Sequence, residues 1–272
     1  MRGYACRRSP RKFSLKLFSV VDVKMAEISQ EVLQGLDTVA QAKLRAAYAA
    51  VDNHVKDGQV VGIGSGSTVV FAVQRLAQRV RDENLRVICI PTSFQARQLI
   101  LENKLVLGDL NANPVLDVAI DGADEVSAQL DCIKGGGGCL LQEKIVASNA
   151  DQLIIIADYS KIADYLGSVW KKGVPLEVIA DCYVPIMRKL EKMGGKPVLR
   201  MAKAKAGPCV TDNGNFIVDC DFGVMQEPAK LEQQLLSIPG LVETGFFLQM
   251  AVKAYFGMQD GSVKTLDAPA RQ

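Results

Sequence analysis

The segment with the clearest chemical potential runs from Lys134 through four consecutive glycines to Glu143 and Lys144. Glycine costs about 1 kcal/mol relative to alanine in regular structure, so a run of four indicates backbone conformations that other residues rarely adopt. Glu143 could remove a proton next to a carbonyl group, and Lys134 could stabilise the resulting enediolate oxygen. A flexible loop followed by a solvated helix face explains the same residues, and this segment alone does not decide between the two.

A second segment, Asp121-Gly-Ala-Asp124-Glu125, places two carboxylates three residues apart after an apolar run. Both could hold a hydroxylated substrate, and one could exchange a proton with a sugar hydroxyl. The alternative is structural, with Asp124 as the N-cap of a short helix. Two acids beside a glycine favour the functional interpretation.

The third segment, Gly62-Ile-Gly-Ser-Gly-Ser-Thr68, follows a predicted strand and opens a predicted helix. Glycines there let backbone N–H groups approach an anion at a helix N-terminus. A dinucleotide-binding fingerprint would need glycine in place of Ser67, and a P-loop would need a lysine before its Ser/Thr. The segment therefore predicts a site for a small phosphate or carboxylate, with a tight turn that binds nothing as the alternative.

These segments belong to a chain in which apolar strands alternate with helices. The predicted strands are continuous apolar runs at residues 59–63, 86–90, 115–120 and 153–157. Apolar periodicity predicts helices at residues 26–57, 67–81, 93–103 and 140–149. Such a pattern is typical of an α/β fold, a parallel sheet with helices on both faces, whose ligands bind at the carboxyl ends of the strands. The polar residues at 65–68 and 121–125, and Asp158 with Lys161, each follow one of these strands, which places them at that edge.

After about residue 167 the pattern changes. It predicts a helix at residues 184–194 and short strands at 174–179, 208–211 and 215–218. Asp212-Asn213-Gly214 is a hairpin-turn sequence, and Pro239-Gly240 marks the end of a second helix. We expect a smaller inserted α+β domain at residues 168–244. The catalytic α/β domain would then comprise residues 25–167 and 245–272, with a last strand from 245 to about 256.

The composition is that of an ordinary globular protein, with 49% apolar and 23% charged residues. The longest aliphatic stretch, residues 153–157, is far shorter than the roughly 18 apolar residues of a membrane span, so no membrane association is expected. Residues 1–24 carry seven basic residues and one acid, which leaves 25 basic and 29 acidic residues in the body. A mildly acidic body does not attract nucleic acid.

The cysteines and the single histidine indicate where the protein is located and which metal chemistry it lacks. Seven scattered cysteines without a C-x-x-C pair indicate reduced thiols and a cytoplasmic protein. The basic leader, residues 1–24, is compatible with a disordered segment or with a transit peptide, and the second would make the location organellar. His54 stands alone, and no Cys/His cluster has the spacing of a zinc site, so no metal is expected.

In their order the motifs resemble ribose-5-phosphate isomerase, type A, over essentially all of residues 30–265. The resemblance lies in GSGST at 64–68, DGADE at 121–125, KGGGG through Glu143–Lys144, Asp158 with Lys161, TDNGN at 211–215 and IPG at 238–240. The spellings IPTSFQARQLI and YFGMQDGSV look like the animal form. The resemblance implies a cofactor-free aldose–ketose isomerase of the pentose phosphate pathway. Its members interconvert ribose 5-phosphate and ribulose 5-phosphate through a cis-enediolate, as homodimers or homotetramers.

The resemblance also implies roles for individual residues. Glu143 matches the base that moves the proton between C1 and C2. Asp121 and Lys134 match residues at the reacting end, and Asp121 is a candidate for ring opening. The implied substrate-binding residues are Ser65, Gly66, Ser67, Thr68, Asp121, Gly122, Ala123, Asp124, Lys134, Gly135, Gly136, Gly137 and Lys161. Ser65 stands where bacterial members often have threonine, and Gly138-Cys139 replaces an Ala-Ala-type pair.

Other functions remain open at this point. A sugar-phosphate deaminase or a CoA transferase could use the same architecture, although a deaminase would recruit a catalytic histidine and His54 falls in the first predicted helix. A non-catalytic sensor would bind a sugar phosphate without converting it. Turnover of ribose 5-phosphate separates the isomerase from the sensor.

Overall fold

The computed structural model describes residue 28 and residues 30–269, so the basic leader at residues 1–24 lies outside the described residues. The main sheet has seven strands in the order β14-β13-β7-β4-β1-β2-β3. Neighbouring strands pair in parallel, except that β14 is antiparallel to β13. These strands are β1 (Val60–Ile63), β2 (Ile88–Pro91), β3 (Val106–Leu107), β4 (Val118–Gly122), β7 (Leu153–Asp158), β13 (Ala251–Gly257) and β14 (Val263–Asp267).

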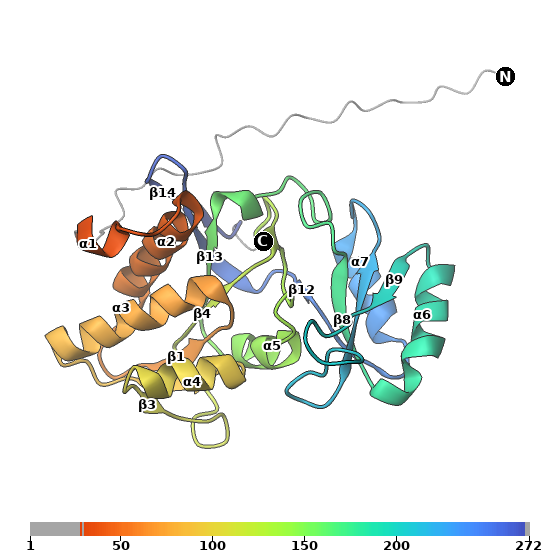
Figure 1. Cartoon of the computed structure of the whole chain (residues 1–272), viewed down its shortest axis with the longest axis horizontal. Coiled ribbons are helices and arrows are strands. Elements are labelled where there is room, and N and C mark those ends of the chain that lie inside the picture. Colours follow the sequence, from red (N-terminus) through yellow and green to blue (C-terminus); the bar gives the residue numbers. More distant parts are fainter. Residues whose placement is uncertain (1–27, 29, 270–272) are drawn as a thin grey trace.

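Helices cover both faces of this sheet (Figure 1). One face carries α2 (Thr38–His54), α3 (Ser67–Glu83) and α4 (Phe94–Glu102), and the other carries α5 (Leu140–Ser148). Strand β7 is apolar throughout because both of its faces are buried: Ile154 and Ile156 pack towards α2 and α3, whereas Leu153 and Ile155 pack on the side of α5. The predicted α/β class is confirmed. The antiparallel strand β14 makes the sheet mixed, which the sequence patterns did not predict.

The first predicted helix is wrong in its extent. Instead of one helix over residues 26–57, the described residues form α1 (Gln30–Leu33) and α2, separated by a turn. Gly35 adopts a φ of 86°, which ends the first helix, and the Asp37 carboxylate accepts a hydrogen bond from Ala40 N at 2.7 Å as the N-cap of α2.

A second, antiparallel sheet has the order β11-β8-β10-β9. Its elements are β8 (Val174–Val178), a 3₁₀ turn η3 (Ala180–Cys182), α6 (Tyr183–Lys192), β9 (Lys196–Leu199), β10 (Phe216–Asp221), α7 (Pro228–Leu236) and β11 (Leu241–Thr244). Leu176 and Val218 of the sheet share a buried core with Leu190 of α6 and Leu235 of α7. We call this part the small lobe, and Figure 1 shows it beside the main sheet.

Two details of the predicted small unit differ from the structure. The segment 208–211 makes only isolated bridges, Pro208 to Met201 and Val210 to Phe216, so the predicted strand is wrong, and β9 and β11 were not predicted. The turn at residues 212–214 is present, with Gly214 at a φ of 79° and its N–H donating to Thr211 O at 2.9 Å. The domain boundaries at residues 168 and 244 stay a prediction.

A three-stranded sheet links the two lobes. It consists of β5 (Glu125–Val126), β6 (Cys132–Ile133) and β12 (Phe246–Phe247), in the order β12-β6-β5. The single strand predicted from residue 245 to about 256 is therefore two strands, because β12 pairs with β6 whereas β13 pairs with β7. Strand β6 contributes Ile133, and β12 contributes Phe246, to the core of the small lobe.

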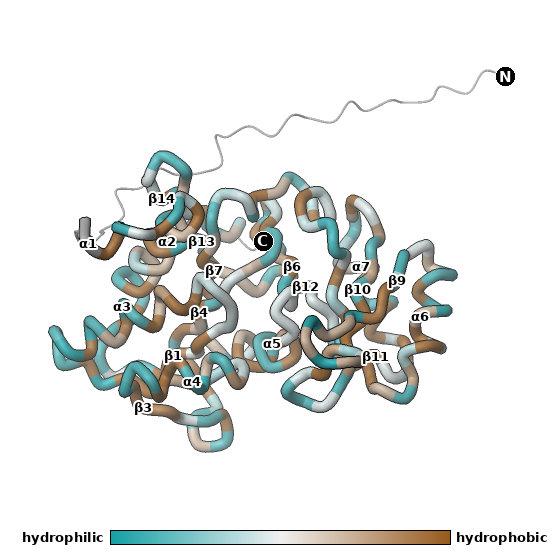
Figure 2. Tube along the Cα trace, viewed as in Figure 1, coloured by the Kyte–Doolittle hydropathy of each residue, from teal (hydrophilic) through white to brown (hydrophobic). Residues whose placement is uncertain are grey.

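In Figure 2, β1 and β4 of the main sheet are mostly brown (hydrophobic), whereas α3 alternates between brown and teal (hydrophilic).

Candidate active site

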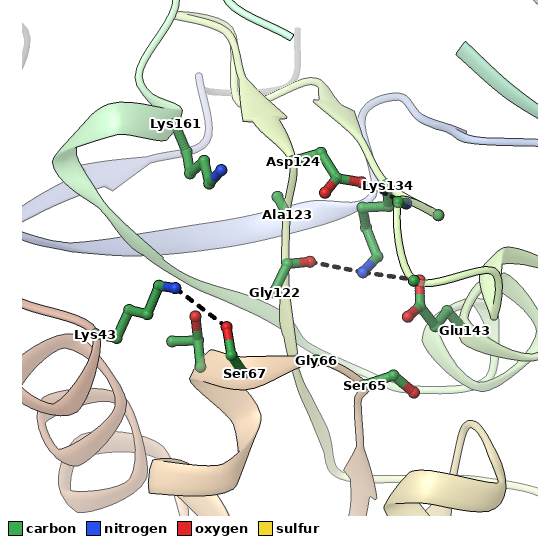
Figure 3. A pocket seen from close by; sticks show the side chains of 14 residues that line it. Lys43, Ser65, Gly66, Ser67, Gly122, Ala123, Asp124, Lys134, Glu143 and Lys161 are labelled. Atoms are coloured by element: carbon green, nitrogen blue, oxygen red, sulfur yellow. Dashed lines mark hydrogen bonds and ion pairs between the residues drawn. The ribbon is translucent and has the colours of Figure 1, made fainter. Parts of the chain in front are cut away.

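A pocket of about 200 Å³ lies at the carboxyl ends of β1 and β4. Its lining residues come from three short segments, one glutamate and two lysines (Figure 3): Ser65, Gly66, Ser67, Thr68, Gly122, Ala123, Asp124, Lys134, Gly135, Gly136, Gly137, Glu143, Lys43 and Lys161. The structure thus brings together every predicted site residue except Asp121. It adds Lys43, which the sequence analysis did not identify.

One end of the pocket is suited to an anion. Helix α3 begins at Ser67, and its N-cap Gly66 has a φ of 103°. The N–H groups in the first turn of a helix have no partner within the helix, and the helix dipole favours negative charge there. Lys43 of α2 donates from Nζ to Ser67 Oγ at 3.1 Å, which places its ammonium at the same end (Figure 3). Lys43 lies mid-helix, so only the packing of α2 on α3 places it at the pocket.

The loop before α3 is held by the segment that follows β2. Ser65 Oγ donates to Ser93 Oγ at 2.6 Å and lies 2.9 Å from Thr92 Oγ1. Gly66 N donates to Gln95 Oε1 at 2.9 Å. The Ser65 hydroxyl therefore points towards residues 92–93, and direct contact between that hydroxyl and a substrate stays a prediction.

The other end of the pocket contains a buried lysine with three acceptors. Lys134 Nζ donates to Gly122 O at 2.6 Å and pairs with Asp121 Oδ2 at 2.9 Å and Glu143 Oε2 at 3.0 Å. Only 2% of Lys134 is exposed. Burial by itself lowers the pKa of Lys134, but the two carboxylates outweigh it and the pKa lies above its usual value. Lys134 is therefore a fixed positive charge at the pocket wall.

Glu143 occupies the first turns of α5, where it lines the pocket beside Lys134 (Figure 3). Burial raises the pKa of Glu143 to about 8, and the Asp121 carboxylate adds to this effect while Lys134 opposes it. Oε2 of Glu143 is buried, and among the described residues it has the Lys134 ion pair but no partner with hydrogen-bond geometry. A carboxylate whose pKa lies near neutral pH can both accept and return a proton.

Asp121 does not line the pocket itself but contacts three residues that do, Ser65, Gly122 and Lys134. Its Oδ1 accepts from Ser65 N at 3.0 Å and Gly122 N at 2.7 Å, and its Oδ2 pairs with Lys134. A Cβ on Gly64 would lie 2.0 Å from Asp121 Oδ1, which explains why glycine occupies position 64. Direct contact of Asp121 with a substrate during ring opening stays a prediction.

Asp124, in contrast, lines the pocket and holds the glycine loop, residues 135–138. Its Oδ2 accepts from Gly136 N at 2.7 Å, and a Cβ on Gly136 would lie 2.5 Å from Oδ1. Burial raises the pKa of Asp124, against the effects of the Gly136 N–H and Lys134. The alternative role as a helix N-cap is wrong, because β5 and not a helix follows.

Lys161, in the 3₁₀ turn η2 (Tyr159–Lys161), lines the same pocket. Its Nζ lies 5.9 Å from the centre of the Trp170 ring.

Two features are absent from the described part of the chain, a membrane-spanning helix and a cluster of metal ligands. None of its helices is both long enough and apolar enough to cross a bilayer. Among residue 28 and residues 30–269, no three Cys, His, Asp or Glu side chains gather where they could hold a metal ion. The His54 ring pairs with Tyr255 and Gln152, and none of these three residues lines the pocket.

The fold and this pocket define a class of protein. A helix N-terminus with a lysine at one end, and a buried carboxylate beside an ammonium at the other, form an α/β enzyme site for a small anionic substrate that undergoes proton transfer.

Comparison with known proteins identifies the family within this class. The model of ribose 5-phosphate isomerase A (phosphoriboisomerase A) matches residues 88–261. A ribose-5-phosphate isomerase from Sus scrofa is 58% identical over 230 residues, which cover 84% of this chain and 75% of that protein. The chain belongs to the ribose 5-phosphate isomerase A family. The family resemblance and the isomerase class predicted from the sequence are confirmed.

Solved structures agree with this assignment. Ribose 5-phosphate isomerase A from Methanocaldococcus jannaschii is 42% identical with a TM-score of 0.78, covering 83% of this chain and 97% of that chain. A D-ribose-5-phosphate isomerase solved in complex with phospho-erythronic acid is 37% identical with a TM-score of 0.81, covering 84% of this chain and 99% of that chain.

Proposed function

We propose that this chain interconverts ribose 5-phosphate and ribulose 5-phosphate by moving one proton between C2 and C1, with Glu143 as the base. The observation that carries the proposal is the buried Glu143 carboxylate, 3.0 Å from Lys134 Nζ, in a pocket whose other end is the N-terminus of α3. Family membership supports the reaction, and the pocket geometry supports the roles of the residues.

The reaction follows from these positions. Glu143 takes the proton from C2 of the open-chain aldose, and the C–H electron pair forms the C1=C2 double bond of a cis-enediolate. The negative charge on O1 lies beside Lys134, which stabilises it. The O2 hydroxyl then loses its proton to O1 as C2=O forms, and Glu143 returns its proton to C1. Acid–base help contributes roughly 10²–10⁴-fold, so charge stabilisation by Lys134 must supply much of the rest.

The remaining pocket residues hold the substrate. The phosphate would lie at the first turn of α3, where Ser67, Thr68 and Lys43 supply donors and positive charge. Asp124 and Lys161 lie along one side of the pocket in Figure 3, where we place the sugar hydroxyls. The solved relative that binds phospho-erythronic acid supports a ligand with a phosphate at one end and a carboxylate at the other.

The test is turnover by NMR in D₂O with EDTA. The wild-type chain should convert ribose 5-phosphate to ribulose 5-phosphate and introduce deuterium at the transferred position. Glu143→Gln should bind substrate and lose nearly all turnover, since the amide cannot accept the proton. Glu177→Gln is the matched control, because Glu177 is also fully buried with one unpartnered oxygen but lies in the small lobe. An active Glu143→Gln variant would contradict the role of Glu143, and binding without any turnover by the wild type would favour a sensor.

We also propose that the protein is a homodimer or a homotetramer. Strand β9 is an edge of the small-lobe sheet, and its Val198 is 63% exposed. Outside the strand, Met201 is 58% exposed and Val210 is 49% exposed. An exposed apolar edge strand is a surface that another chain commonly covers. Light scattering after gel filtration would test this, and a fully active monomer would contradict it.

We propose a cytoplasmic location, supported by the unpaired cysteines of the described residues. Imaging the full-length chain and a chain without residues 1–24, each fused to a fluorescent protein, tests it. Organellar import of the full-length chain alone would instead assign a transit peptide to residues 1–24.

A further inference from the structure

The glycine loop that lines the reacting end of the pocket is held from outside by an arginine of the small lobe. Arg200, directly after β9, donates from Nη1 to Gly135 O at 2.9 Å and to Gly136 O at 3.2 Å. The guanidinium is fixed in turn by Asp219 of β10, which accepts from Nε at 2.8 Å and from Nη2. The side chains of Arg200 and Asp219 are 16% and 15% exposed.

Arg200 does not itself line the pocket. The carbonyl groups that accept its hydrogen bonds therefore point to the outside of the loop. On the inside, Gly136 N donates to Asp124 Oδ2, and Gly135, Gly136 and Gly137 form the wall next to Lys134. Arg200 thus fixes which way two peptide groups of the catalytic wall face.

The direction of those peptide groups matters for the chemistry. A carbonyl oxygen that turned inward would place negative partial charge beside an anionic substrate and beside the developing enediolate. Glycine adopts positive and negative φ angles about equally readily, so the backbone of the loop would not by itself prevent such a turn. Gly135 already adopts a φ of 97°. The positive charge of Arg200 also helps to keep the neighbouring Asp124 ionised. The glycines supply the freedom to adopt the conformation, and Arg200 selects it.

We propose that Arg200, anchored by Asp219, is a positioning residue for the isomerisation: it holds the Gly135 and Gly136 carbonyls away from the pocket so that the wall beside Lys134 and Glu143 accommodates the enediolate. This rests on the proposed function, because the reacting end is assigned there. The small lobe contributes none of the pocket-lining residues, so it acts on the pocket from outside, and Arg200 is its contact with the Gly135 and Gly136 carbonyls.

The experiment compares Arg200→Met with Arg75→Met. Arg75 forms a similar part-buried pair with Asp52, at 2.7 Å and with 12% and 11% of the side chains exposed, but it touches no pocket loop. Displacing a catalytic wall by about 1 Å lowers rates by roughly 10- to 100-fold, so kcat of Arg200→Met should fall by that factor. The Ki of inorganic phosphate, which probes the far end of the pocket, should stay within about two-fold. Arg75→Met should keep its kcat, and Arg200→Lys should recover part of the loss.

Amide hydrogen exchange gives the second readout. Exchange in the segment 134–138 should accelerate in Arg200→Met and not in Arg75→Met. Should Arg200→Met fail to fold, Asp219→Asn replaces it, since it keeps the guanidinium and loosens its anchor. Its expected result is a smaller fall in kcat with faster exchange in the same segment. A kcat within about two-fold of the Arg75→Met value in a folded variant overturns the proposal. An unchanged kcat of Arg200→Met together with an inactive Glu143→Gln would leave the proposed function intact. An active Glu143→Gln would instead refute the role of Glu143 as the base.

Discussion

Replacing Asp121 by asparagine should shift the acidic limb of the pH–rate profile to lower pH. The base must be deprotonated to act, so activity rises as the pH rises through the pKa of Glu143. Burial raises that pKa to about 8, and the Asp121 carboxylate contributes to the increase. Removing the Asp121 charge leaves Glu143 as the sole carboxylate paired with Lys134. The pKa of Glu143 must then fall, and activity should persist to lower pH.

The size of the shift can be bounded from the geometry. Asp121 Oδ2 and Glu143 Oε2 lie 2.9 and 3.0 Å from the same Lys134 Nζ, so they are at most about 6 Å apart. Two unit charges about 6 Å apart at an effective dielectric constant near 20 repel by roughly 3 kcal/mol, or about two pKa units. Relaxation of the loop around the new amide reduces this, so a downward shift of about one to two pH units is expected.

The assay is kcat/KM for ribose 5-phosphate between about pH 5 and pH 10, measured on Asp121→Asn and on wild type. The height of the plateau should also drop, because the amide weakens the hold on Lys134. The position of the limb, not its height, tests the reasoning. Asp117→Asn serves as the control: Asp117 directly precedes the same strand β4, and its carboxylate accepts from Val60 N at 2.7 Å, so its limb should not move.

An acidic limb that stays in place, or that moves to higher pH, would refute the argument. Either result would mean that the limb reports another group or that Asp121 does not raise the pKa of Glu143. The alkaline side carries a second check, because the pKa of Lys134 lies above its usual value and the lysine should stay charged throughout the range.

The remaining predictions concern the anion end and the loop before α3. Lys43→Met should raise KM and the Ki of inorganic phosphate by roughly 10-fold, the value of a charge-assisted hydrogen bond, and should change kcat little; a fall in kcat at constant KM would contradict it. Gly64→Ala should lower the free energy of unfolding by about 1–3 kcal/mol, because the added Cβ would lie 2.0 Å from Asp121 Oδ1. The same substitution should abolish most of kcat/KM. Urea denaturation and steady-state rates measure both effects, and an unchanged kcat/KM would show that the loop tolerates the shift.

The parallel sheet could be predicted because its strands are buried on both faces and therefore read as continuous apolar runs. Residues 153–157 are an example, since the whole of β7 is buried. Shorter or half-exposed strands carry no such signal. Strand β9 is buried on neither face completely and contains Pro197, and β12 has only two residues, so neither was predicted. The break before α2 was missed because it depends on one positive φ angle at Gly35.

The composition of the site could be predicted, but its internal arrangement could not. Residues 65–68 and 121–125, and Asp158 with Lys161, follow predicted strands, and parallel strands bring their carboxyl ends to one edge. Lys43 and Arg200 carried no signal, because a lysine on a helix and an arginine after a short strand are ordinary surface residues by sequence. Only the packing of α2 on α3, and of the small lobe on the glycine loop, gives them their partners.

The two carboxylates of the DGADE segment show where spacing stops being informative. Asp121 is the penultimate residue of β4, and its side chain turns to the N–H groups of Ser65 and Gly122 and to Lys134. Asp124 lies beyond the strand, where the chain has turned, and its carboxylate lines the pocket. Only two residues therefore separate an acid that raises the pKa of the base from an acid that lines the pocket. Which is which depends on where β4 ends, and the residues alone leave that open because β4 ends at Gly122, between the two acids.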